Sequence, residues 1–211
     1  MNNDNNNNIR NIMIKVLLLG DTDVGKTCLI NTYFERPFNE YSYYNTFMEI
    51  HTKKINVENI NYNFRILDMP GRERFRNQIR PNLRNTKIII LVFDMTQKKT
   101  FLELDLFLEE IVNNLGHRAS LILIGNKSDR SDYLEIKEKE AKKFAEIINA
   151  KCFIASAKDE PEKFRIFLND YLEEYIKEHK DELINNNQQI AINLNNRNRN
   201  RNRNRRRNNC G

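Results

Sequence analysis

Four short aliphatic runs constrain this chain to a sheet that is covered on both faces. They read VLLLG (16–20), IIILVFD (88–94), LILIG (121–125) and CFIAS (152–156), and each ends at a Gly, Asp or Ser. Continuous apolarity is typical of strands that are buried on both sides, whereas half-exposed strands alternate between apolar and polar residues. We therefore expect a mostly parallel sheet with helices packed on both faces.

Helical patterns separate these runs. Apolar residues that recur at spacings of three and four are Leu104, Leu108, Ile111, Val112 and Leu115, and later Phe164, Phe167, Leu168, Tyr171, Leu172, Tyr175 and Ile176. Such stripes predict helix faces that pack in the core. Residues 47–67 instead contain two extended segments around a polar turn, which is a hairpin pattern. The order of elements predicts an α/β fold whose six-stranded sheet is mostly parallel with one antiparallel edge strand.

The two ends of the chain differ in composition from its middle. MNNDNNNN opens the chain, and the last residues are rich in Asn and Arg. Such polar tracts cannot bury enough apolar surface to fold. We therefore predict a disordered Asn-rich N-terminus (1–10), one folded domain (11–183) and a disordered Asn/Arg-rich tail (184–211).

The tail accounts for the positive charge of the protein. The 211-residue chain has a formal charge of +6, and residues 185–211 contain seven Arg and no Lys, Asp or Glu, which leaves −1 for the rest. The run RNRNRNRNRRR has three interpretations: a strip attracted to an anionic membrane, a binder of nucleic-acid phosphates, or a solvated linker. No apolar run is long enough to span a bilayer. Three cysteines far apart in the sequence, Cys28, Cys152 and Cys210, are typical of a reducing cytosol.

The octapeptide GDTDVGKT, which begins at Gly20, carries a specific functional signal. It matches the phosphate-binding pattern G-x-x-x-x-G-K-[ST] between an apolar strand and a helical stretch, the context that the pattern requires. Gly20 and Gly25 allow backbone N–H groups to face phosphate oxygens, Lys26 reaches the β- and γ-phosphates, and the Thr27 hydroxyl can ligate Mg²⁺. Asp23 departs from this chemistry, because a carboxylate repels phosphate.

Three further strand ends carry polar residues that complement this loop. Asp68 can hold Mg²⁺ through water, and Gly71 can offer its N–H to a γ-phosphate. In the sequence GNKSD, Asn126 and Asp129 can form a pocket in which a carboxylate accepts the two adjacent N–H donors of guanine. The fourth strand end reads SAK from Ser156. Because ligands of such sheets bind at the carboxyl ends of the strands, we expect these side chains at one site.

With these four motifs in order, the chain resembles the Ras-like small GTPases over roughly residues 13–180. The resemblance implies a P-loop GTPase fold that binds GTP or GDP together with Mg²⁺. The nucleotide-binding residues that it implies are Gly20, Asp21, Thr22, Asp23, Val24, Gly25, Lys26, Thr27, Cys28, Phe38, Asp68, Met69, Pro70, Gly71, Arg72, Asn126, Lys127, Asp129, Ser156, Ala157 and Lys158.

The same resemblance assigns roles to individual positions. Phe38 matches the aromatic residue against the guanine ring, with a core position under the loop as the alternative. The metal ligands implied are Thr27, Thr46 and Asp68. The catalytic residues implied are Lys26, Thr46, Gly71 and Arg72. The effector-contacting loop implied is Tyr41, Ser42, Tyr43, Tyr44, Asn45, Thr46, Phe47, Met48, Glu49 and Ile50.

Within this family the chain is most similar to the Rab branch. ERFR (73–76) follows the DxxG segment as it does in Rabs, and the long tail has a cysteine at its end. The chain departs from the Rab pattern at PNLRNT (81–86), where Rabs usually have YYRGA, and at Leu67, where tryptophan is usual. We expect a divergent Rab, with an unclassified Ras-like protein as the alternative.

Arg72 stands where small GTPases usually have the glutamine that orients the attacking water. Glutamine donates and accepts hydrogen bonds, whereas arginine has N–H donors and no acceptor. Arginine can instead lie against the γ-phosphate in the ground state as well as in the transition state, which adds affinity without rate. We therefore predict slow unaided hydrolysis. The alternatives are an arginine acting in cis, which speeds hydrolysis, and a side chain that points into solvent, which again predicts slow turnover.

Cys210, followed only by Gly211, is the candidate lipidation site. One lipid chain binds membranes weakly, but each Arg near an anionic surface adds about 1 kcal/mol. We expect a prenylated switch in vesicle traffic, at the cytoplasmic face of a membrane with a cytosolic pool, that meets an exchange factor, an activating protein and effectors. The alternatives are a constitutively GTP-bound scaffold and, less favoured, a P-loop protein whose tail binds RNA.

Overall fold

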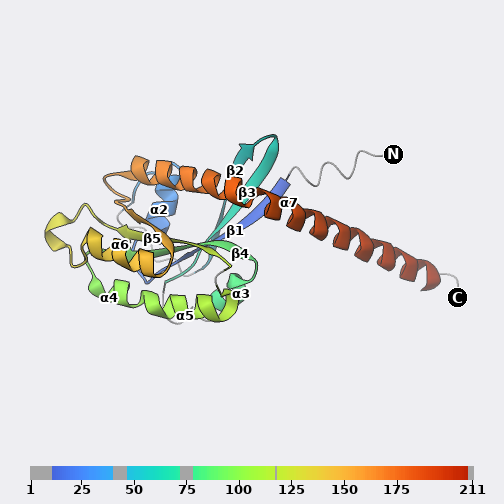
Figure 1. Cartoon of the computed structure of the whole chain (residues 1–211), viewed down its shortest axis with the longest axis horizontal. Helices are drawn as coiled ribbons and strands as arrows, with labels where there is room; N and C mark the ends of the chain where they lie inside the picture. Colours follow the sequence, from blue (N-terminus) through green and yellow to red (C-terminus); the bar gives the residue numbers. More distant parts are fainter. Residues whose placement is uncertain (1–10, 40–46, 72–77, 117, 209–211) are drawn as a thin grey trace. The chain divides into compact units, whose positions relative to one another are not determined.

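The computed structural model describes residues 11–39, 47–71, 78–116 and 118–208, with only the backbone described for residues 190–208. Strands and helices alternate along the chain (Figure 1). The elements are β1 (Asn11–Leu19), α2 (Lys26–Tyr33), β2 (Glu49–Val57), β3 (Ile60–Asp68), α3 (Ile79–Leu83), β4 (Thr86–Asp94), α4 (Lys98–Leu102), α5 (Leu104–Leu115), β5 (Ser120–Asn126), the 3₁₀ turn η2 (Ser131–Tyr133), α6 (Glu138–Ile147), β6 (Ala150–Ile154) and α7 (Pro161–Asn208).

The six strands form one sheet in the order β2-β3-β1-β4-β5-β6. The pairs β1·β4, β4·β5 and β5·β6 are parallel. β2 and β3 are joined by Glu58 and Asn59, both with positive φ angles (51° and 63°), as a two-residue turn of a hairpin requires. So short a connection joins neighbouring strands only when they run antiparallel. The predicted sheet, mostly parallel with one antiparallel edge strand, is therefore confirmed.

The register of the parallel strands brings their carboxyl ends to one edge. Asp94 at the end of β4 lies opposite Asn126 at the end of β5, and Gly125 lies opposite Ile154 at the end of β6. Leu19, which precedes the glycine-rich loop, lies opposite Leu91 of β4. The motifs that follow these strands therefore meet at the same edge of the sheet.

One face of the sheet packs against α3, α5 and α6. The buried side chains that the strands contribute to this face are Leu17, Leu19, Leu67, Ile89, Leu91, Phe93 and Leu123. They meet Leu83 of α3, Ile111 of α5 and Ala141 of α6 in one hydrophobic cluster. Because side chains alternate along a strand, Val16 and Leu18, which are also buried, face the opposite side.

On that side α2 packs against the start of α7. The rings of Tyr33 and Phe164 meet edge to face with their centroids 6.5 Å apart, and the Tyr33 hydroxyl donates a 2.8 Å hydrogen bond to Oδ1 of Asn169. Phe153 of β6 stacks on Phe167 of α7 at a centroid distance of 4.3 Å. Helices therefore cover both faces of the sheet, as the aliphatic runs predict.

The predicted core stripes are confirmed except at Val112. This residue of α5 is 51% exposed, whereas Leu104 and Ile111 on the same helix are buried. A helix face that packs on a sheet is about 100° wide, and Val112 lies at the margin of the stripe on the solvent side. The prediction that Val112 belongs to the core is therefore wrong.

Helix α7 runs without a break into the segment that the sequence assigns to a disordered tail. Its buried side chains end at Leu183, and none of the side chains described between that residue and residue 189 is buried. Between Leu183 and residue 189 the helix therefore has no described side chain that core packing would stabilise, and Asn has a low helix propensity. The domain limits at residues 10 and 183 stay predictions.

The chain divides into two units. The larger contains the described residues of the nucleotide motifs and comprises residues 14–53 and 64–171. The smaller comprises residues 1–13, 54–63 and 172–211, and within it Lys180 forms an ion pair with Glu58. Across the part of the chain that the structure describes, no helix combines the length and the apolarity that crossing a membrane requires.

Candidate functional site

The loop between β1 and α2 depends on two glycines. Gly20 has a φ of +148°, and a Cβ atom there would lie 2.2 Å from the carbonyl oxygen of Val92 in β4. Gly25 has a φ of +90°, and a Cβ atom there would lie 2.2 Å from Nδ2 of Asn126. Neither position has room for a side chain. The loop therefore lies directly against the ends of β4 and β5, and this close approach fits the predicted phosphate-binding loop.

Lys26, the first residue of α2, lies inside this loop. Only 7% of the residue is exposed, and its Nζ donates hydrogen bonds to the carbonyl oxygens of Gly20 (2.9 Å) and Asp21 (2.6 Å). Burial lowers the pKa of Lys26 to about 8, against the carboxylates of Asp68, Asp21 and Asp23, which raise it. A phosphate anion in the loop would favour the charged form further. Asp23 itself is exposed, in a left-handed conformation (φ 64°).

Thr27 and Asp68 form the adjoining oxygen pair. The Thr27 hydroxyl donates a 2.6 Å hydrogen bond to Oδ2 of Asp68, which ends β3 and is fully buried. Burial is the largest influence on Asp68 and raises the pKa of its carboxyl, whereas the Thr27 hydrogen bond and the charge of Lys26 lower it. Hydroxyl and carboxylate oxygens are ligands that Mg²⁺ prefers. The donor set therefore fits the metal ion that the sequence predicts at these two residues.

Gly71 lies on the backbone of the phosphate-binding loop. A Cβ atom there would lie 2.4 Å from the carbonyl carbon of Asp21 and 2.5 Å from the backbone nitrogen of Thr22. Thr22 in turn donates its N–H to Oδ1 of Asp21 at 2.7 Å. Met69 and Pro70, which connect β3 to this glycine, are buried. The DxxG segment and the loop are thus in direct contact.

Asn126 connects the phosphate-binding loop to the SAK segment. Its Nδ2 donates a 2.9 Å hydrogen bond to the carbonyl oxygen of Val24, and its Oδ1 accepts a 3.3 Å hydrogen bond from the N–H of Ala157. The residue is 1% exposed. An amide side chain can join two segments in this way, because its nitrogen donates and its oxygen accepts.

Asp129 and Ser156 form a second contact between the GNKSD and SAK segments. The Ser156 hydroxyl donates a 2.7 Å hydrogen bond to Oδ1 of Asp129, and the same oxygen of Ser156 accepts the N–H of Asp159 at 2.8 Å. Ser156 is buried, whereas Lys158 is exposed. The carboxylate predicted to accept guanine's donors is therefore held in a fixed orientation.

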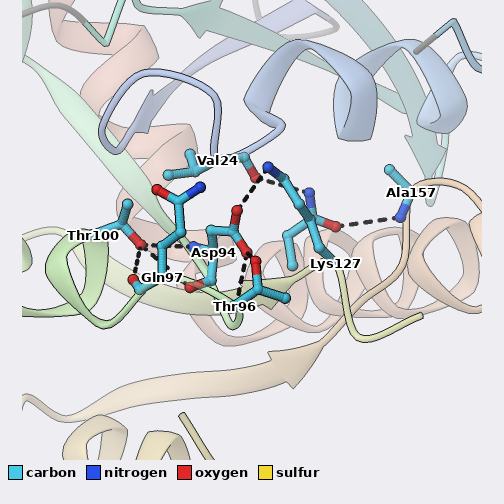
Figure 2. A network of polar contacts seen from close by, with 8 residues as sticks. Val24, Asp94, Thr96, Gln97, Thr100, Lys127 and Ala157 are labelled. Carbon is cyan, nitrogen blue, oxygen red and sulfur yellow. Dashed lines mark hydrogen bonds and ion pairs between the residues drawn. The ribbon is translucent and has the colours of Figure 1, made fainter. Parts of the chain in front are cut away.

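Lys127 has a partner that the sequence analysis missed. Its Nζ lies 2.7 Å from Oδ2 of Asp94, the last residue of β4, in the polar network that Figure 2 shows. In the sequence, Asp94 is only the last residue of an apolar run. The signal that could have identified it is its place, an acid that ends an apolar run at the same edge as Asp68 and Asn126.

The described part of the predicted effector loop is largely exposed. Phe47 is 80% exposed and Ile50 is 44% exposed, whereas Met48 is partly buried against the core cluster. Phe38 is 37% exposed, so the alternative that it belongs to the core is wrong. Cys28 lies in the first turn of α2, with its sulfur 4.0 Å from the carbonyl oxygen of Asn39.

Several predicted site residues lie outside the described residues. They are Tyr41, Ser42, Tyr43, Tyr44, Asn45 and Thr46 of the effector loop, the candidate catalytic residue Arg72, and the candidate lipidation site Cys210.

Comparison with known proteins decides the family. The family model described as the Ras family matches residues 15–177. The chain belongs to the Ras family. The GTPase is 36% identical over 145 residues to Ras-related protein RabJ of Dictyostelium discoideum. The matched region covers 69% of this chain and 57% of that protein.

Two further relatives cover more of their own length. The GTPase is 33% identical over 159 residues to Ras-related protein Rab-21 of Bos taurus, covering 75% of this chain and 72% of that protein. It is 30% identical over 186 residues to Ras-related protein Rab-13 of Bos taurus, covering 86% of this chain and 90% of that protein. The predicted resemblance to Ras-like and Rab-like small GTPases is thus confirmed, and the chain is a GTP hydrolase that binds GTP and GDP.

Proposed function

We propose that this GTPase is a switch in membrane traffic whose unaided hydrolysis of GTP is slow, with Arg72 as the reason. Its similarity to proteins named as Rabs supports the switch in traffic. The packing of Gly71 against the backbone of Asp21 and Thr22 is the observation that carries the hydrolysis proposal. Arg72 follows this glycine directly in the sequence.

The chemistry of residue 72 then decides the rate. A water that attacks phosphorus needs a neighbour that accepts one of its protons in a hydrogen bond, and a guanidinium has no acceptor. Its positive charge stabilises bound GTP and the transition state alike, and equal stabilisation of both does not raise the rate. The protein therefore remains GTP-loaded until an activating partner supplies the missing group.

The remaining residues of the site bind and orient the nucleotide. Lys26 neutralises charge on the phosphates from inside the loop, as its burial and its hydrogen bonds to loop carbonyls favour. Thr27 and Asp68 hold Mg²⁺, together with Thr46. When bound, this ion neutralises charge that develops on the phosphate oxygens. Asp129, oriented by Ser156, accepts the N–H donors of guanine.

The hydrolysis proposal is tested by single-turnover hydrolysis of bound GTP with Mg²⁺, comparing the wild type with Arg72→Gln. We expect the glutamine variant to be faster by about tenfold or more, which is about 1.4 kcal/mol of activation free energy. Arg80→Gln is the matched control, because Arg80 is an exposed arginine of α3 that pairs with Glu110. A wild type that equals or exceeds Arg72→Gln would overturn the proposal and favour an arginine that acts in cis.

The membrane part of the proposal rests on the tail. Prenylation of Cys210 supplies one weak anchor, and seven arginines supply a second, electrostatic one. Flotation with liposomes that contain anionic lipid, after expression in a eukaryotic cell, compares the wild type with Cys210→Ser. We expect the serine variant to lose most of its flotation. Equal flotation of the two proteins would exclude the lipid anchor.

The exposure of Phe47 and Ile50 supports the assignment of residues 41–50 as an effector surface. Exposed aromatic side chains are suited to contacts with a protein partner. A pull-down with the GTP-loaded and GDP-loaded protein, repeated with Phe47→Ala, tests this assignment. We expect to find partners that bind only the GTP-loaded protein, and we expect Phe47→Ala to lose this binding.

A further inference from the structure

The carboxyl end of β4 carries a buried acid, Asp94, and each of its two carboxylate oxygens has a partner. Its Oδ1 accepts hydrogen bonds from the N–H (2.8 Å) and the hydroxyl (2.7 Å) of Thr96, and its Oδ2 pairs with Nζ of Lys127 at 2.7 Å (Figure 2). The N–H of Asp94 donates to the Thr100 hydroxyl at 3.0 Å, and that hydroxyl donates to the carbonyl oxygen of Gln97 at 2.8 Å. Both the backbone and the carboxylate of Asp94 are therefore fixed.

Lys127 stands between the two residues that define the guanine side of the site. Asn126 holds Val24 on one side, and Asp129 accepts the Ser156 hydroxyl on the other. The backbone of Lys127 has a φ of 66°, a left-handed conformation that is unfavourable for a residue with a Cβ atom. The ion pair with Asp94 holds the side chain of this strained residue.

Asp94 and Lys127 differ in how far their side chains are exposed to solvent. The side chain of Asp94 is 1% exposed, whereas that of Lys127 is 20% exposed. A ligand at the site can therefore reach Lys127 but not Asp94. Any effect of Asp94 on the nucleotide has to be transmitted through the lysine.

Stability alone does not account for a buried pair of this kind. Removing two charges from water has a large desolvation penalty, and well-packed apolar residues often replace such a pair without loss of stability. A buried pair does provide a fixed position for a charged side chain that would otherwise sample many rotamers. Here that side chain lies within the guanine-recognition segment.

We propose that Asp94 is a positioning residue for nucleotide binding: it holds Lys127 against the bound nucleotide and thereby prolongs the residence of the nucleotide without selecting the base. The inference rests on the proposed nucleotide site. Base selection belongs to the carboxylate of Asp129, which has its own orienting partner and does not share the network of Asp94.

The first test measures the release of fluorescent GDP and fluorescent inosine diphosphate from the full chain with Mg²⁺. Inosine diphosphate lacks the amino group through which a carboxylate selects guanine. We expect Asp94→Asn to release both nucleotides about tenfold faster, which is about 1.4 kcal/mol, and to leave the ratio of the two rates unchanged. Asp129→Asn is expected to abolish the preference for GDP. An unchanged release rate in Asp94→Asn, or a loss of base preference there, would overturn the proposal.

The second test asks whether Asp94 acts through Lys127. We expect the double variant Asp94→Asn/Lys127→Met to release GDP at the rate of Lys127→Met alone, because the second substitution removes nothing further. This comparison also serves if Asp94→Asn does not fold, because the double variant contains neither charge of the pair. A double variant that is several-fold faster than Lys127→Met would show that Asp94 acts by another route.

Two controls separate the possible failures. Glu138→Gln breaks another carboxylate–lysine pair, the exposed contact with Lys142 at 2.6 Å in α6, and is expected to leave both release rates unchanged. A wild-type protein that does not retain GDP would contradict the proposed nucleotide site itself. A wild type that retains GDP, with Asp94→Asn releasing it at the same rate, would contradict only the role of Asp94.

Discussion

The hydroxyl of Thr27 and the carboxylate of Asp68 are joined by a 2.6 Å hydrogen bond that links the first turn of α2 to the end of β3. The two residues are 41 positions apart in the sequence, and each is predicted to ligate Mg²⁺. The protein thus brings the two oxygens together through its own hydrogen bond. An oxygen pair oriented in this way binds a cation with little further loss of side-chain freedom.

The first prediction concerns the Mg²⁺ dependence of nucleotide release. Thr27→Ala removes the hydroxyl, and we expect it to release GDP at least about tenfold faster in Mg²⁺, since a hydrogen bond to a charged group contributes roughly 1.5–3 kcal/mol. Release of fluorescent GDP is measured with Mg²⁺ and again with EDTA. EDTA should accelerate release from the wild type and from the control Thr27→Ser, which keeps the hydroxyl, but should have little effect on Thr27→Ala.

The second prediction concerns the contact between Gly71 and the phosphate-binding loop. Gly71→Ala places a methyl group 2.4–2.5 Å from loop backbone atoms, so the two segments have to separate. Because the Gly71 N–H is expected to meet the γ-phosphate, the affinity for GTP should fall by about tenfold or more relative to that for GDP. Calorimetric titration of both nucleotides measures this ratio.

Gly116→Ala is the matched control for that substitution. Gly116 has a φ of 59°, and apart from the adjoining backbone no atom of the described residues lies within 4 Å of the place where its Cβ would be. Gly116 has a ψ of −135°, so alanine there has only the backbone strain of a conformation that glycine alone readily adopts, which is roughly 1–3 kcal/mol of stability. Its nucleotide affinities should be those of the wild type. If Gly71→Ala kept the wild-type ratio of GTP to GDP affinity, the assigned role of the contact would be wrong.

The sheet could be predicted because a strand that is buried on both faces is apolar at every position. This pattern is visible in the sequence without knowing what the strand packs against. VLLLG, IIILVFD, LILIG and CFIAS each correspond to a strand of the structure, and the loop that begins at Gly20 lies where its motif places it. The hairpin was predictable too, because Glu58 and Asn59 form a polar turn between two extended segments.

What the sequence could not show are relationships that depend on the partner's position in space. Asp94 reads as the last residue of a strand, and only the parallel register with β5 reveals that it lies opposite Asn126 and beside Lys127. Val112 has the spacing of a core residue, but the width of the contact between α5 and the sheet leaves it exposed. The hydrogen bond from Tyr33 to an asparagine of α7 likewise has no local signature.

The third prediction concerns this hydrogen bond between α2 and α7. Tyr33 is 1% exposed, and Tyr33→Phe keeps the ring but leaves Oδ1 of Asn169 without this donor. We expect a loss of roughly 1–2 kcal/mol in the free energy of unfolding, the cost of leaving a partly buried acceptor unsatisfied. Urea unfolding followed by circular dichroism measures it. Tyr133→Phe, at a tyrosine that is 74% exposed, should change the free energy by less than about 0.5 kcal/mol.

The fourth prediction concerns the reactivity of Cys152. Burial raises the pKa of this thiol, with Glu138 also raising it and Lys142 lowering it. The thiolate is the reactive form, so iodoacetamide should modify Cys152 more slowly at pH 8 than it modifies glutathione. Mass spectrometry of Cys28→Ser/Cys210→Ser isolates the remaining thiol. A rate equal to that of glutathione would contradict the raised pKa.

The same shift fixes the sign of a stability effect. The folded state keeps the proton of Cys152 to a higher pH than the unfolded state does, so it binds more protons above the unfolded pKa of the thiol. The contribution of this group to stability therefore falls as the pH rises from the unfolded pKa of the thiol to its raised pKa in the folded state. Cys152→Ala should remove this component from the pH dependence of unfolding.

The fifth prediction concerns the extension of α7. Leu183 is the last buried side chain described on the helix, so a chain that ends at residue 183 should unfold with the wild-type free energy to within about 0.5 kcal/mol. A chain that ends at residue 171 loses the buried side chains of Leu172, Tyr175 and Ile176 and should lose several kcal/mol. Urea unfolding of the three chains measures both effects. Destabilisation by the first truncation would show that the tail contributes to the fold.

The contact with Asn126 is a second reason why position 25 requires glycine. Any side chain at that position would collide with the amide nitrogen that holds Val24, and an amide displaced in this way would also withdraw its oxygen from Ala157. The requirement for Gly25 therefore belongs to the protein's own architecture as well as to its ligand. The segments proposed to bind phosphate and guanine, which lie far apart in the sequence, therefore depend on the same asparagine.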